Sequence, residues 1–134
     1  MLLDNKRIFV IEDDETNLAI ISTTLRRNGA KVFFDTWGGG TVDALKRFQP
    51  IDLILLDLAL PRGLSGYDVF DRIREIPELK DIPVVLVTAA DPGMEMNKAR
   101  QKGVDGYIPK PINYYTFGQL ISDILQGKQV WGEE

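Results

Sequence analysis

The segment IDLILLDLALP, residues 51–61, contains a short apolar run that stops abruptly at an acid. Ile54, Leu55 and Leu56 form the run, and Asp57 ends it. A continuous apolar run of this length is typical of a strand buried on both faces, as in a parallel sheet covered by helices. Open α/β sheets bind ligands at the carboxyl ends of their strands. Asp57 is therefore either a functional carboxylate at such an end or an ordinary acid that opens a loop, and the remaining sequence has to decide.

The composition of the 134 residues limits the chemistry that the chain can perform. A hydrophobic content of 44% is enough for the core of one domain. The net charge of −4 and the pI of about 4.9 argue against binding to nucleic acid or a membrane surface, which usually needs a basic face. There are no cysteines and no histidines, so thiol nucleophiles, disulfides and histidine-based sites are excluded. Any chemistry must use Asp, Glu, Lys, Ser, Thr or Tyr.

The ends of the chain and its hydropathy carry no targeting signal. The first residues, MLLDNKR, form no secretion signal, and no apolar run is long enough to span a bilayer. We therefore expect a cytoplasmic protein with a single domain over residues 1–134 and a core from about residue 6 to 126. The tail, residues 127–134, is polar except for Val130 and Trp131, and we expect it to be frayed.

Strand-like and helix-like patterns alternate five times. Strands are expected at residues 7–11, 31–35, within the 51–61 segment, at 82–87 and at 106–109. After each strand, apolar residues recur at helical spacing. The expected helix N-caps are Thr41, Ser65, Asp91 and Asn113, and the expected helix stops are Gly29 and Gly103. This alternation predicts an α/β fold, with a parallel sheet, right-handed crossovers and helices on both faces.

Residues with useful chemistry follow four of the five expected strands. Glu12 and Asp13 follow the first strand, Asp57 the third, Thr88 the fourth and Lys110 the fifth. In a parallel sheet all of these positions share one edge. Each residue alone also has an ordinary explanation as a helix-terminal acid, a turn residue or a solvated charge. Their joint occurrence favours a common site.

The charges of this cluster indicate what it would bind. At an effective dielectric near 20, carboxylates about 4–5 Å apart repel by roughly 3–4 kcal/mol, so three of them either raise their pKa values or recruit a cation. A site with only oxygen ligands favours Mg²⁺, which commonly also takes a phosphate oxygen. We therefore predict that Glu12 and Asp13 hold Mg²⁺ and that Asp57 is the nucleophile of an aspartyl-phosphate. Thr88 and Lys110 would bind phosphoryl oxygens.

These motifs resemble the receiver domain of two-component response regulators, of the chemotaxis-regulator kind. The resemblance runs from about residue 7 to 125. Its pieces are Glu12-Asp13, LILLDLALP around Asp57, VVLVTA with Thr88, and GVDGYIPKP with Lys110-Pro111. It implies a flavodoxin-like, doubly wound, five-stranded parallel sheet in the order 2-1-3-4-5, with five helices.

The resemblance also implies a function and a ligand set. A sensor histidine kinase or a phosphotransfer protein would donate a phosphoryl group to Asp57, with Mg²⁺ as the required cofactor. The metal ligands would be Glu12, Asp13, Asp57 and the backbone carbonyl of Ala59. The Lys110–Pro111 peptide bond would be cis. The protein would be a phosphoacceptor that assists its own phosphorylation and dephosphorylation, not a turnover enzyme.

A conformational switch is part of the same resemblance. Tyr107 matches an aromatic residue that turns inward when Thr88 moves toward the phosphoryl group. The face formed by the fourth helix, the fifth strand and the fifth helix would then change shape for a protein partner or a homodimer. Tyr114 and Tyr115 are candidates for that contact, whereas Phe117 fits the core better. No direct contact with nucleic acid or a membrane is expected, and the downstream target stays open.

Three features depart from the usual family pattern. The loop near Arg62-Gly63 carries one extra residue, so its shape is open, and Pro109 before Lys110 is unusual. Ala59 and Ala90 are small where relatives often carry larger groups, so neither side chain is expected to assist the water that removes the phosphoryl group.

Two rival readings remain. An aspartate-nucleophile phosphatase would need a second acid at position 59, which is alanine. A receiver-like interaction module that no longer accepts phosphate would lack one of the five site residues, and all five are present.

Overall fold

The protein is built on one parallel sheet, seen in a computed structural model that describes residues 1–132. Its strands are β1 (Arg7–Ile11), β2 (Lys31–Asp35), β3 (Leu53–Leu56), β4 (Val84–Thr88) and β5 (Gly106–Pro109). All neighbouring strands are parallel, in the order β2-β1-β3-β4-β5. The predicted flavodoxin-like topology is confirmed.

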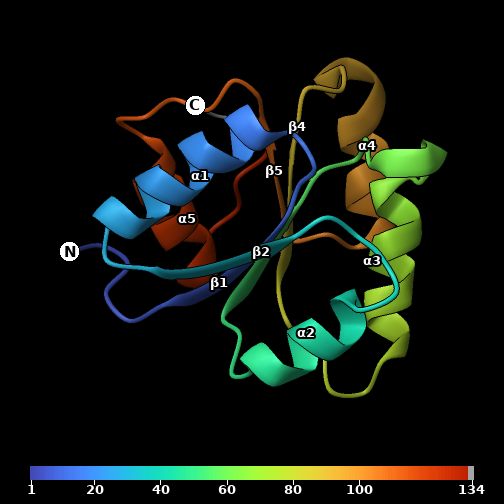
Figure 1. Cartoon of the computed structure of the whole chain (residues 1–134). Helices are drawn as coiled ribbons and strands as arrows, with labels where there is room; N and C mark the ends of the chain where they lie inside the picture. Colours follow the sequence, from blue (N-terminus) through green and yellow to red (C-terminus); the bar gives the residue numbers. More distant parts are fainter. Residues whose placement is uncertain (133–134) are drawn as a thin grey trace.

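Helices cover both faces of this sheet (Figure 1). The elements are α1 (Glu15–Arg27), α2 (Thr41–Phe48), the 3₁₀ turn η1 (Pro61–Gly63), α3 (Gly66–Glu75), α4 (Pro92–Lys102) and α5 (Phe117–Leu125). α1 and α5 pack on one face, and α2, α3 and α4 on the other. Within residues 1–132, none of the helices combines the length and the apolar character needed to cross a membrane.

The central strand β3 shows why the apolar run is continuous. Every residue of this strand is buried. Ile54 and Leu56 enter the core beneath α2, α3 and α4, whereas Leu53 and Leu55 enter the core beneath α1 and α5. Successive side chains of a strand point to opposite faces, so a strand covered on both sides needs apolar residues at every position.

Several helix boundaries lie where the sequence placed them. Ser65 caps α3 by accepting a hydrogen bond from the N–H of Tyr67, and Asp91 caps α4 by accepting one from Gly93. Gly103 ends α4 at a φ of 93°, a left-handed conformation that favours glycine. The strand boundary at β4 is shifted, because the strand begins at Val84 instead of Ile82. Pro83 has no N–H to donate to a neighbouring strand.

Two predicted N-caps are wrong. Thr41 is the first residue of α2, and its hydroxyl donates to Asp35 Oδ2 at 2.9 Å instead of capping the helix. Asn113 lies one turn before α5, where its side chain accepts from the N–H of Tyr115 at 2.9 Å. In both cases the side chain finds a closer partner in a neighbouring strand end or turn.

The prediction of a frayed tail is also wrong for residues 130–132. Tyr107 donates its N–H to the carbonyl of Val130 at 3.0 Å and accepts from the N–H of Gly132 at 2.8 Å. Val130 is only 2% exposed, and the guanidinium of Arg100 lies 4.5 Å from the ring centre of Trp131. The tail pairs here because β5 is an edge strand with backbone groups to satisfy. Residues 133–134 lie outside the described part of the chain.

We expect Val130→Ala to lower the free energy of unfolding by about 1–2 kcal/mol, because it removes buried methyl groups. It should also speed hydrogen exchange at the Tyr107 amide, which the tail protects. Urea unfolding and amide exchange measured by NMR would test this. Leu2→Ala, which truncates a half-exposed side chain, is the control. An unchanged Tyr107 exchange rate would show that the tail pairing does not persist in solution.

Candidate functional site

Three carboxylates meet at the carboxyl edge of the sheet. Glu12 and Asp13 follow β1, and Asp57 follows β3. These two strands are neighbours, hydrogen-bonded to each other in the sheet. Their nearest carboxylate oxygens all lie within 4.8 Å of one another. Glu12 and Asp57 are buried, whereas Asp13 is exposed. The structure therefore brings together the three acids that the sequence placed at strand ends.

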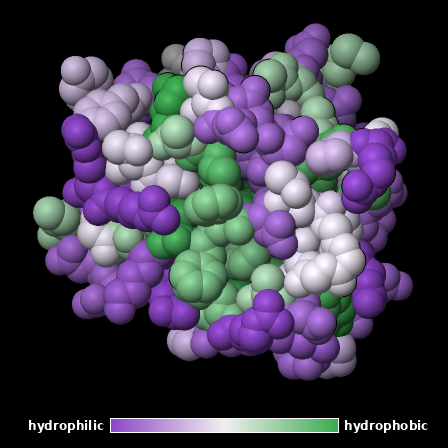
Figure 2. All heavy atoms as spheres, in the orientation of Figure 1, coloured by the Kyte–Doolittle hydropathy of each residue, from purple (hydrophilic) through white to green (hydrophobic). Residues whose placement is uncertain are grey.

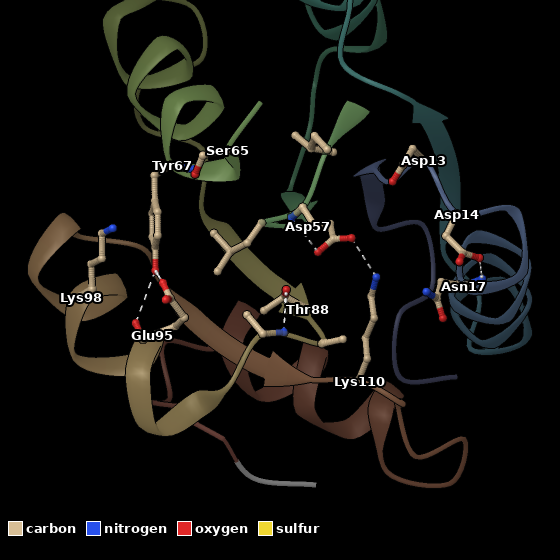
Figure 3. A pocket seen from close by; sticks show the side chains of 15 residues that line it. Asp13, Asp14, Asn17, Asp57, Ser65, Tyr67, Thr88, Glu95, Lys98 and Lys110 are labelled. Carbon is tan, nitrogen blue, oxygen red and sulfur yellow. Dashed lines mark hydrogen bonds and ion pairs between the residues drawn. The ribbon is translucent and has the colours of Figure 1, made fainter. Parts of the chain in front are cut away.

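Lys110 lies between two of these acids. Its ammonium donates to Glu12 Oε1. It also donates to Asp57 Oδ2 at 3.0 Å, the contact drawn in Figure 3. The Lys110 side chain is 7% exposed, so both ion pairs are largely shielded from water. Buried ion pairs of this kind are costly to break, because removing one partner leaves an unpaired buried charge.

The protonation of Glu12 reflects this environment. Burial raises its pKa to about 7, which the hydrogen bond from Lys110 opposes and the nearby Asp57 reinforces. For Lys110, burial by itself would lower the pKa, but its bonds to Glu12 and Asp57 outweigh burial and raise it. With all three acids ionised, the single ammonium leaves two negative charges uncompensated. A divalent cation with a preference for oxygen ligands fits this charge and this donor set.

Asp57 opens onto a cleft of about 770 Å³. Ala59 and Ala90 line it, so small side chains border the space beside the carboxylate. The N–H of Ala59 donates to Asp57 Oδ1 at 3.3 Å. Thr88, at the end of β4, is 1% exposed and its hydroxyl oxygen accepts from the N–H of Ala90 at 3.2 Å. The Thr88 hydroxyl hydrogen is left to donate into the cleft.

Ala90 also connects Thr88 with Tyr107. The Tyr107 hydroxyl donates to the carbonyl of Ala90 at 3.0 Å, and the ring is fully buried. The rotamer change of Tyr107 that the family resemblance implies stays a prediction. What the structure shows is that Thr88 and Tyr107 both hydrogen-bond to the backbone of Ala90.

The far wall of the cleft contains residues that the sequence analysis missed. Tyr67 of α3 donates to Glu95 Oε1 at 2.9 Å, and the Lys98 ammonium lies 4.7 Å from the Tyr67 ring centre. Burial and the Glu95 carboxylate both raise the pKa of Tyr67. Figure 3 shows this group on the side of Asp57 opposite Asp13. No local motif links a tyrosine and a glutamate on different helices, so no pattern in the sequence pointed to them.

Gly66 marks a loop in the sequence, but its close contact with the site was not predicted. A Cβ atom placed on Gly66 would lie 2.3 Å from the carbonyl oxygen of Asp57 and 2.8 Å from Cα of Leu58. The N–H of Gly66 donates to the carbonyl of Leu58 at 2.8 Å. Glycine therefore allows α3 to begin directly against the backbone of Asp57 and Leu58.

The loops around the site show two further features. The Lys110–Pro111 peptide bond is cis, as the family resemblance implied, and Gln49–Pro50 is cis as well. The longer loop after Asp57 forms the turn η1, in which Arg62 and Gly63 adopt φ values of 61° and 69°. This turn lies where the family resemblance implies one extra residue, and residues 61–63 do not line the cleft.

Comparison with known proteins defines the class. The sequence model of the response regulator receiver domain matches residues 8–122. A curated relative, the polar-differentiation response regulator DivK of Brucella ovis, is 32% identical over 120 residues, which is 90% of this chain and 96% of DivK. Together with the five-stranded sheet and the acidic cleft, these matches show that the chain belongs to the response regulator receiver domain family.

Solved structures agree with this assignment. The receiver domain of sensor histidine kinase PA1611 from Pseudomonas aeruginosa PAO1 has a TM-score of 0.76 and 28% identity, covering 92% of this chain and 99% of that one. That structure has a magnesium ion coordinated in its active site cleft. A putative response regulator from Chloroflexus aurantiacus shares the fold, with a TM-score of 0.81 and 23% identity over 92% of this chain and 99% of its own.

The raised pKa of Glu12 predicts how stability depends on pH. Without divalent cations, the folded state holds a proton on Glu12 up to about pH 7, whereas the ordinary pKa of this side chain is 4.5. The folded state therefore binds more protons than the unfolded state between these values. We expect the free energy of unfolding to fall by about 1–3 kcal/mol as the pH rises from roughly 5 to 8.

Urea unfolding in a chelating buffer at both pH values would measure this slope. Glu12→Gln should flatten it, and Asp13→Asn, which alters an exposed neighbour, should preserve it. A wild-type slope retained in Glu12→Gln would contradict the assignment to Glu12.

We expect Gly66→Ala to cost about 2–4 kcal/mol of folding free energy, because the new methyl group meets backbone atoms that cannot move aside easily. Gly39→Ala is the matched control, since nothing lies within 4 Å of a Cβ at Gly39. Thermal unfolding of the two variants would test the prediction. Equal stability of the two variants would mean that Gly66 does not lie as close to the backbone of Asp57 and Leu58 as described.

Proposed function

We propose that this receiver domain is a phosphoryl-accepting switch, phosphorylated on Asp57 by a histidine kinase or a phosphotransfer protein. The observation that supports this most directly is the buried Asp57 carboxylate, which Lys110 holds at 3.0 Å at the edge of an open cleft. An Asp57 oxygen would form the new P–O bond as the P–N bond of the donor phosphohistidine breaks. The phosphoryl group would enter through the cleft.

The residues that would hold Mg²⁺ are Glu12, Asp13 and Asp57, together with the backbone carbonyl of Ala59. Three acids with oxygens within 4.8 Å of one another are a donor set suited to this ion. The bound ion would supply positive charge beside the oxygens of the transferring group.

Lys110 and Thr88 would bind the oxygens of the phosphoryl group on Asp57. Lys110 already contacts the acceptor carboxylate, so its ammonium is placed to pair with a phosphoryl oxygen. The Thr88 hydroxyl has a hydrogen available to donate, since its oxygen accepts from Ala90. Ala59 and Ala90 offer no polar side chain to a water molecule in the cleft. The acceptor role is favoured over a phosphatase because position 59 has no acid to protonate a leaving group.

The signal would pass from Thr88 to Tyr107. A phosphoryl group adds nearly two negative charges at Asp57 and would draw in the Thr88 hydroxyl. Tyr107 is tied to the same segment through the carbonyl of Ala90, so this movement would stabilise one arrangement of β5 and α4. The face formed by α4, β5 and α5 would then be read by a partner protein, or by a second copy of the chain.

The aromatic residues around the start of α5 have different environments. Tyr115 is 89% exposed and Tyr114 is 44% exposed, so both are accessible to a partner. Phe117 is fully buried and belongs to the core, as the sequence indicated.

The proposal is tested by intact-mass measurement after incubation with a small acyl phosphate and Mg²⁺. We expect the wild type to gain one phosphoryl group and to gain none when the metal is chelated. Asp57→Asn should gain none under either condition. Asp81→Asn, which changes an exposed carboxylate outside the acidic cluster and its cleft, should behave like the wild type. Labelling of Asp57→Asn, or metal-independent labelling, would contradict the proposed site.

A further inference from the structure

The two outer edges of the sheet differ. At the β5 edge, the described tail pairs with Tyr107. At the β2 edge no further strand is paired within residues 1–132, and Phe33 and Phe34 are each 54% exposed. Figure 2 shows apolar side chains gathered over the region where β2 runs in Figure 1. An open edge with two exposed aromatic residues is a surface suited to strand pairing.

The backbone of β2 is not paired with another strand on its outer side within residues 1–132, although the Val32 carbonyl there accepts from the Arg26 side chain at 3.2 Å. Lys31 donates its N–H to Lys6, and Asp35 accepts from Glu12, so these residues face β1. Because backbone groups alternate in direction along a strand, Val32 and Phe34 direct their N–H and C=O groups away from β1. These two residues are the ones that an added strand would pair with.

The sequence of β2, KVFFD, is complementary to itself in the antiparallel direction. Centred on Phe33, such a pairing places Lys31 opposite Asp35 of the other copy and Val32 opposite its Phe34. The two positions whose backbone groups point outward then face each other as hydrogen-bonded pairs, and the Phe34 N–H of the other copy would replace or join Arg26 at the Val32 carbonyl. We propose that β2 pairs with β2 of a second copy, forming a symmetric dimer with one continuous sheet.

The side chains support this register on both faces. Phe33 is stacked on Phe48 at a centroid distance of 3.8 Å, and across the axis it would meet Phe33 of the second copy. Phe34 borders a shallow groove with Leu18 and Ala19 of α1, where Val32 of the second copy would lie opposite it. Aromatic pairs and aromatic–β-branched pairs are favourable across antiparallel strands.

The charges at the strand ends favour a second copy over an unrelated peptide. Lys31 is exposed at one end, and Asp35 at the other is fixed by the hydroxyl of Thr41 at 2.9 Å. In the proposed register both ends form opposite-charge pairs, whereas a shift by two residues would place Lys31 opposite the apolar Phe33. Complementary end charges thus select a single alignment.

The first test uses charge reversal and sedimentation analysis at protein concentrations up to about 0.5 mM, where a Kd near 1 mM is visible. We expect the wild type to dimerise and Lys31→Asp and Asp35→Lys each to weaken dimerisation at least tenfold. An equimolar mixture of the two variants should restore dimers, because in the mixed dimer each strand end of one variant again faces the opposite charge on the other. A monomeric wild type, or dimers that ignore both substitutions, would overturn the proposal.

The second test uses the absence of native cysteines. Phe33→Cys places identical thiols opposite each other on the symmetry axis, whereas Phe34→Cys places them on a diagonal about 7–8 Å apart. The two sites have equal exposure, so each controls for the other. We expect disulfide-linked dimers to form at least tenfold faster with Phe33→Cys. Equal rates at the two positions would refute the register.

Acyl-phosphate labelling of the Lys31→Asp variant separates this proposal from the switch function. Lys31 lies outside the acidic cluster and its cleft, so labelling at Asp57 should match the wild type. Labelling that is preserved while dimerisation is lost supports β2 as a separate surface. Labelling that is lost together with dimerisation would refute this separation.

Discussion

The ammonium of Lys110, buried between Glu12 and Asp57, is the interaction on which the site depends. Two buried carboxylates this close would otherwise repel strongly, and one of them would take up a proton. Lys110 compensates only one of the three charges in the cluster, and burial still raises the pKa of Glu12 to about 7. The site is therefore stable enough to fold but remains short of positive charge. This imbalance supports the proposal that the site takes up a divalent cation and a phosphoryl group.

Direct backbone contacts connect this site with two neighbouring elements, α3 and β5. Gly66 lets α3 begin against the carbonyl of Asp57. A shift of the backbone at Asp57 and Leu58 would therefore press against that helix. Ala90 receives the Tyr107 hydroxyl and donates to Thr88, which ties the cleft to β5. β5 is in turn held by residues 130–132 of the tail. These contacts support the proposed route from Asp57 to the β5 edge of the sheet.

The sequence predicted the sheet and the meeting of Glu12, Asp13, Asp57, Thr88 and Lys110 at one edge, because both follow from one-dimensional patterns. Buried strands need unbroken apolar runs, and parallel strands bring their ends together, so residues distant in sequence become neighbours. The partners of Thr41 and Asn113 are local, six and two residues away, and were missed because capping residues form such turn contacts as readily as they cap a helix. The contact between Tyr67 and Glu95 instead depends on how α3 and α4 pack. The tail was predicted to be frayed because its own sequence is mostly polar, and its pairing depends on hydrogen bonds to Tyr107 of β5, which is distant in sequence.

The charged residues at the ends of β2 restrict how this open sheet edge can pair with another strand. Exposed edge strands invite unselective pairing, and charges on the edge are a common protection against it. Lys31 and Asp35 provide such charges at β2, yet they flank two exposed aromatic residues, which weakens the protection in the middle of the strand. In an alignment shifted by two residues, the lysine would lie against an apolar neighbour without a partner. In the antiparallel alignment centred on Phe33 the same charges attract, so they exclude other partners while permitting a second copy of the chain.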